Sequence, residues 1–64
     1  MAINPNNDEV EVYKDRNGEY RWRRVDGDNG KILFASSESY VKGSYAEEAA
    51  EVYNPGIPVI RADR

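Results

Sequence analysis

Apolar and polar residues alternate in three short runs along the first half of the chain, and each run has the period of a β-strand. The runs cover residues 9–14, 19–26 and 31–36. Two turn segments separate them, residues 15–18 and 27–30, and each ends in Asn-Gly. Asn-Gly between alternating runs is a strong hairpin signal. The pattern therefore predicts an antiparallel meander of three strands.

The length of the two turns decides which side chains share a face of this sheet. A two-residue turn at the first Asn-Gly would leave neither face apolar. A three-residue loop ending in a left-handed Gly18 sets Val12 opposite Trp22, and the same loop at the second turn sets Arg24 opposite Phe34. We therefore prefer this bulged register. It gathers six apolar side chains on one face: Val10, Val12, Tyr20, Trp22, Ile32 and Phe34.

The second half of the chain predicts one helix that covers this apolar face. Ser44 and Glu47 have the spacing of a capping box, so we expect a helix from about Tyr45 to Tyr53 with Ser44 as its N-cap. The Asn-Pro-Gly sequence at residues 54–56 stops it. Four side chains at helical spacing would face the sheet: Ala46, Ala49, Ala50 and Tyr53.

The C-terminal residues allow one further element, a short strand. Val59 and Ile60 are apolar enough for a short fourth strand, and Pro58 would confine that strand to an edge of the sheet. We expect residues 1–8 to form a loose polar arm and residues 9–64 a single domain. The predicted fold class is α+β, with a three-stranded antiparallel meander packed on one helix and a short C-terminal edge strand.

The composition narrows the function and favours self-association. The 64 residues contain no Cys and no His, which excludes disulfides, thiolate metal sites and the commonest general base. We therefore expect no metal, no cofactor and no enzymatic activity. A chain this short buries a thin core and is often supported by a partner subunit. We predict a homodimer, with no membrane association and a cytoplasmic location.

Five residues are candidates for contact with a partner, because they lie on the mixed face of the predicted sheet: Tyr13, Arg21, Arg23, Val25 and Leu33. The net charge of −3 disfavours indiscriminate binding to nucleic acid. The alternative function is nevertheless a nucleic-acid or nucleotide binder that uses the Arg-rich second strand and Lys42. Against it, the register places Tyr20 and Trp22 on the opposite face from the arginines. Bases stacked on the rings would therefore lie far from the cations.

Three motifs lie within residues 11–40: an aromatic-Lys-Asp turn at residues 13–15, Gly-Glu-Tyr-Arg-Trp-Arg at residues 18–23 and Asn-Gly-Lys-Ile at residues 29–32. Over residues 11–40 the chain thereby resembles the YegP-like family of small proteins, DUF1508 (UPF0339). The resemblance weakens from Ser39 onwards. It implies a three-stranded sheet with one helix, present as tandem copies or as single copies that pair. Because this chain holds one copy, the resemblance implies a homodimer and no biochemical activity.

Overall fold

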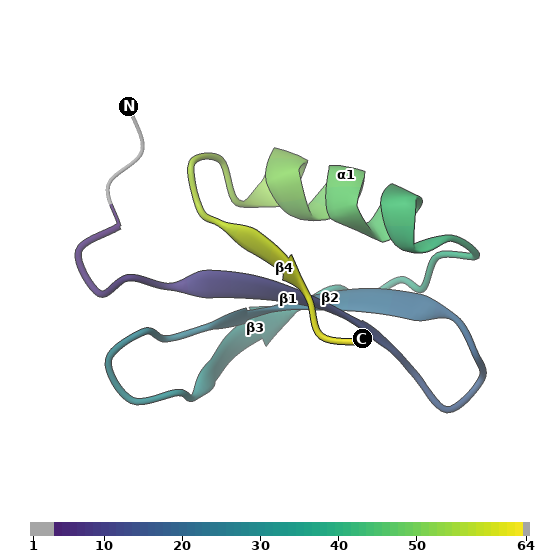
Figure 1. The fold of residues 1–64 in the computed structure, drawn as a ribbon, viewed down its shortest axis with the longest axis horizontal. Coiled ribbons are helices and arrows are strands. Elements are labelled where there is room, and N and C mark those ends of the chain that lie inside the picture. The colour runs from purple at the N-terminus through teal and green to yellow at the C-terminus, as the bar shows by residue number, and fades with distance from the viewer. Residues whose placement is uncertain (1–3, 64) are drawn as a thin grey trace.

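The computed structural model describes residues 4–63, which form four strands and one helix (Figure 1). The sheet has the order β3-β2-β1-β4, in which β1 is antiparallel to β2 and parallel to β4. The α+β class, the meander and the edge strand are confirmed. The elements are β1 (Glu9–Lys14), β2 (Tyr20–Val25), β3 (Ile32–Ala35), α1 (Gly43–Tyr53) and β4 (Val59–Arg61).

The fourth strand makes β1 a central strand. Residues 36–58 cross from β3 at one edge of the sheet to β4 at the other, and α1 lies over one face on the way (Figure 1). Two backbone hydrogen bonds join β1 to the ends of the β4 segment, from Val10 N to Pro58 O at 2.8 Å and from Ala62 N to Val12 O at 2.8 Å. Pro58 lies just before the edge strand, where its missing N–H breaks no ladder bond.

The first turn has the predicted register. Val12 pairs with Trp22, and Gly18 is left-handed with φ of 77°. Asp15 N donates to Glu19 O at 2.7 Å, which closes a loop of three residues. The Asp15 carboxylate also accepts the Glu19 N–H at 3.0 Å. Asp at the first position and Gly at the fourth therefore select the bulged loop over a two-residue turn.

The second turn is one residue longer than expected. Asp26 N donates to Lys31 O at 2.8 Å, so four residues lie between the closing pair. As a result Ile32 pairs with Val25, and a bulge in β3 then restores the predicted pair formed by Phe34. Because paired residues share a face, the prediction that Ile32 faces the helix is wrong. It lies with Val25 on the opposite face.

The helix begins two residues earlier than expected. The N-cap is Lys42, which makes no side-chain capping bond, and the expected N-cap Ser44 lies inside the helix. Gly43 is the first helical residue and lies against the guanidinium group of Arg61, with no room for a β-carbon. The start of α1 thus has no capping side chain and lies against a side chain of β4.

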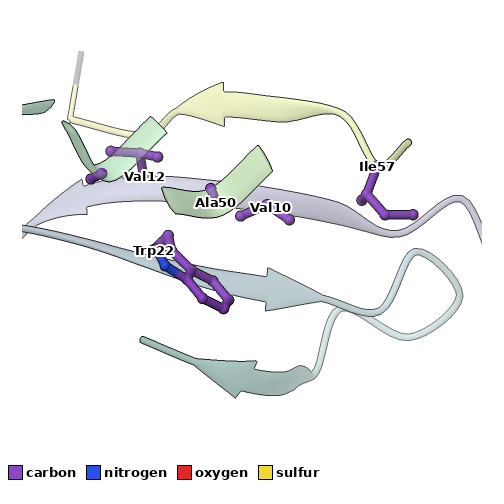
Figure 2. Close-up of a cluster of buried hydrophobic side chains, with 6 residues drawn as sticks. Val10, Val12, Trp22, Ala50 and Ile57 are labelled. Carbon is purple, nitrogen blue, oxygen red and sulfur yellow. The ribbon is translucent and has the colours of Figure 1, made fainter. Parts of the chain in front are cut away.

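The core lies between α1 and the two central strands. Ala46 and Ala50 are fully buried against the sheet, as predicted, and the small alanines let the helix approach closely (Figure 2). Tyr53 is 67% exposed but still stacks on the ring of Trp22. Asn54 ends the helix, with its side-chain N–H donating to Ala50 O at 2.9 Å. The buried apolar residues are Val10, Val12, Trp22, Ala46, Ala50 and Ile57.

The segment before β1 forms a bonded turn where a loose arm was expected. Asn4 Nδ2 donates to Asp8 O at 3.0 Å, and Asp8 N donates to Asn4 Oδ1 at 2.7 Å. The buried Asp8 carboxylate accepts the Gly27 N–H at 3.0 Å and pairs with Arg24 at 2.9 Å. The Gly27 N–H, followed by Arg24, lowers the pKa of Asp8 against an opposing effect of burial. Residues 1–3 of the expected arm lie outside the described residues.

Acidification is expected to destabilise the fold, in part through Asp8. A carboxyl group whose pKa is lower in the folded chain stabilises that chain above its unfolded pKa, near 4. That contribution is lost as the pH falls through the folded pKa. Urea unfolding between pH 7 and pH 2 should show a smaller loss of stability in Asp8→Asn. Asp28→Asn removes the same charge at an exposed position and should follow the parent chain. An equal loss of unfolding free energy between pH 7 and pH 2 in the parent chain and both variants would exclude this role for Asp8.

Candidate interaction surface

Four of the five predicted contact residues share the sheet face that α1 leaves open. Tyr13 pairs directly with Arg21, and Arg23 and Val25 follow at alternate positions of β2. All four are partly buried. Leu33 lies on β3, at the edge of the sheet, and is 47% exposed. The structure therefore brings the first four together and places Leu33 beside them on the edge strand.

The cations of this face are already paired within the chain. Arg21 Nε lies 3.0 Å from Asp15 Oδ2, and Arg23 Nε lies 2.7 Å from Glu11 Oε1. The Arg23 guanidinium also lies 4.4 Å from the centre of the Tyr13 ring. Hydrogen bonds to Asp15, first from the Glu19 N–H and then from Arg21, lower the pKa of that carboxyl. A phosphate would have to displace these carboxylates from both arginines.

The face of the sheet that α1 covers is no better suited to binding nucleic acid. Trp22 faces the helix, opposite to Arg21 and Arg23, as the register predicts. Arg24 shares the helix-side face but pairs with Asp8, and Lys42 lies over the ring of Tyr45 at 5.5 Å. The arrangement thus does not favour a platform of stacked bases and phosphate-binding cations.

The most exposed apolar element is β3. The helix packs on β1, β2 and β4, and within residues 4–63 no Cα atom of α1 lies within 8 Å of a Cα atom of β3. Figure 1 shows β3 at the edge of the sheet opposite to β4 and away from α1. Ile32 is 57% exposed, and Leu33 and Phe34 are each 47% exposed. This strand therefore presents three large apolar side chains and one unpaired backbone edge.

The two edges of the sheet differ in their protection against pairing. The β4 segment has three residues, follows Pro58 and carries Arg61, which pairs with Glu47 at 2.9 Å. Proline, charge and shortness are the usual devices that keep an edge from pairing with another chain. The sequence of β3 is Ile-Leu-Phe-Ala, with neither proline nor charge. Of the two edges, β3 is the one suited to pairing.

A small hollow lies beside β3, with Trp22 in its wall. The Trp22 ring meets Phe34 edge-on at 6.1 Å and stacks on Tyr53 at 5.9 Å between centres. The hollow has a volume of about 260 Å³. Its wall combines the end of β3 and the segment after it with rings from β2 and α1: Trp22, Ala35, Ser36, Ser37, Glu38, Tyr40 and Tyr53.

Sequence reasoning did not find this hollow. Residues 36–40, which form part of its wall, bond to β2 and to the residue before it. Ser36 Oγ accepts the backbone N–H of Trp22 at 3.2 Å, and the backbones of Tyr20 and Tyr40 exchange two hydrogen bonds at 2.7 Å. Ser39 Oγ donates to a carboxylate oxygen of Glu19. No local pattern signals a wall assembled from three separate elements, because only tertiary packing brings them together.

Two further features bear on the class of protein. Among the described residues, no group of three acidic side chains is placed to hold a metal ion. The one helix found in residues 4–63 is too short and too polar to cross a membrane.

Comparison with known proteins gives a structural relative. No protein-family profile and no curated protein matches the chain. The chain is similar to a protein from Haloferax volcanii whose solution structure was determined by NMR. The two sequences are 38% identical, the match covers 86% of this chain and 95% of the other, and the TM-score is 0.61.

Proposed function

This chain belongs to the family of the Haloferax volcanii protein, and within that family we propose for it the role of a non-catalytic interaction module that pairs with a second copy of itself. We also propose that this family is the YegP-like one, on the resemblance of residues 11–40. The lack of His and Cys supports a function without acid–base or thiol chemistry.

The observation that carries the proposal is the exposed, uncharged edge of β3. An edge strand without proline or charge pairs readily with another strand. Two copies of β3 can meet antiparallel about a two-fold axis between Leu33 and Phe34. Ile32 then lies opposite Ala35, and Lys31 lies opposite Ser36, so no like charges face each other. The result is one continuous eight-stranded sheet with apolar side chains buried at its centre.

The mass of the chain in solution tests this proposal. Light scattering after gel filtration should give twice the 7.3 kDa mass of one chain. Leu33→Lys should raise the dissociation constant at least about tenfold, because the two-fold axis places both introduced charges in one interface. The circular dichroism spectrum of the variant should be unchanged, since the Leu33 side chain is half exposed.

Two control variants locate the interface. Val52→Lys changes an apolar side chain that is 75% exposed on α1, and it should leave the dimer intact. Ile60→Lys places the same charge on β4, the other edge strand. Dissociation by Ile60→Lys alone would move the interface to β4 and refute pairing through β3. A folded parent chain that stays monomeric at millimolar concentration would refute the dimer itself.

A further inference from the structure

The aromatic rings of this protein fall into two groups. Four of them each lie under a Lys or Arg cation of the chain, at centroid distances of 4.4 to 5.7 Å: Tyr13, Tyr20, Phe34 and Tyr45. The other three are Trp22, Tyr40 and Tyr53. These three line the hollow beside β3, and among the described residues none has a cation over its ring. The hollow is thus the place where aromatic surface is left without a cation.

Glu38 supplies the negative charge of the same hollow. Its side chain lines the wall and is exposed. It has no ion pair or hydrogen bond with any other residue in the described part of the chain, whereas Glu11 and Glu47 are each paired with an arginine. A carboxylate in the same wall as the rings of Tyr40 and Tyr53 attracts a cation and repels an anion.

Trp22 contributes its ring to the wall, while its indole nitrogen is buried. Trp22 is 5% exposed, and its indole N–H has no hydrogen-bond acceptor within residues 4–63. In Figure 2 the nitrogen edge of the ring faces the end of the sheet at which β2 begins, where Tyr20 bridges to Tyr40. Because this nitrogen exposes no surface, a molecule in the hollow would contact the ring of Trp22 and not its N–H.

We propose that the hollow binds a small organic cation, an alkylammonium group. The ammonium would lie against the rings of Tyr40 and Tyr53 beside the Glu38 carboxylate. A volume of about 260 Å³ lies just below the range of roughly 300–1,000 Å³ for drug-sized ligands. The hollow therefore suits a cation of a few carbon atoms, and self-association is not required for it.

A matched pair of probes separates charge from shape. Choline and 3,3-dimethylbutan-1-ol have the same outline and the same hydroxyl, and they differ only in the positive charge. Trp22 is the one tryptophan of the chain, so its fluorescence reports directly on the hollow. Titration of the full chain at constant ionic strength should give saturable binding of choline, with a dissociation constant on the order of 1–10 mM. The alcohol should bind at least about fivefold more weakly.

Two pairs of variants assign the binding to named side chains. Glu38→Gln should weaken choline binding about three- to fivefold and leave the alcohol unaffected. Glu51→Gln removes the same charge from an exposed helix position and should change neither. Tyr53→Leu should weaken choline binding, whereas Tyr45→Leu removes a half-exposed ring outside the hollow and should not.

Three outcomes would overturn the proposal. Equal binding of the two probes would make the hollow a plain apolar site. No saturation up to about 100 mM choline would leave no specific site at all. A peptide bearing trimethyllysine that binds at least tenfold more tightly than choline would assign the cation to a protein partner instead of a small molecule.

Discussion

Replacing Trp22 by alanine is expected to lower the free energy of unfolding by about 3–5 kcal/mol. Trp22 is the one large aromatic side chain in the core, which otherwise consists of valine, alanine and isoleucine. A chain of 64 residues has a total stability of roughly 3–10 kcal/mol. The variant should therefore lose a large share of the stability of the chain.

Circular dichroism in urea measures this effect, because the substitution removes the fluorophore. Trp22→Phe keeps an apolar ring, so it should lose about half as much stability. Val52→Ala shortens a side chain that is 75% exposed, and it should stay within about 0.5 kcal/mol of the parent. A Trp22→Ala chain as stable as Val52→Ala would show that the core does not depend on this ring.

Gly27→Ala is expected to cost about 1–3 kcal/mol and to release the turn before β1. A β-carbon at Gly27 would overlap the backbone carbonyl groups of Asn6 and Asn7. Neither can move away without disturbing Asp8, whose carboxylate accepts the Gly27 N–H and pairs with Arg24. The strain falls on backbone atoms and not on a flexible side chain, so local adjustment cannot relieve it.

Amide hydrogen exchange tests this prediction at residue level. In Gly27→Ala the amides of Asn7 and Asp8, which donate to Asn4, should exchange faster, together with the global loss of stability in urea. Asp28→Ala changes an exposed side chain in the same loop and should leave both measurements close to those of the parent. Unchanged protection of Asn7 and Asp8 in Gly27→Ala would contradict the packing of Gly27 against this turn.

The first hairpin was predictable because its information is local. Asp15 and Gly18 specify a three-residue loop, and that loop sets the pairing of Val12 with Trp22. The second hairpin was predicted one residue too short, since the Asp26 carboxylate accepts the Asp28 N–H at 2.7 Å and the loop closes at Asp26. The bulge in β3 then returns the strand to the expected pairing. A choice between loops of three and four residues depends on such small differences.

The start of the helix shows where local signals mislead. Ser44 and Glu47 match a capping box, but Glu47 pairs with Arg61 of β4, a residue that lies 14 positions away. The Arg61 guanidinium also lies against Gly43, the first residue of the helix, where a β-carbon would meet it. A tertiary contact therefore outweighed a capping preference worth about 1 kcal/mol.

The sequence by itself determined the strand and helix periods, the first turn and the separation of Arg21 and Arg23 from Trp22, because these depend on residues a few positions apart. Only the tertiary structure decided that β4 pairs in parallel with β1 and that α1 leaves β3 uncovered. It also decided that three rings and Glu38 line one hollow. These features depend on where residues 36–58, which connect β3 to β4, pack on the sheet. Contacts between residues far apart in the sequence control that position.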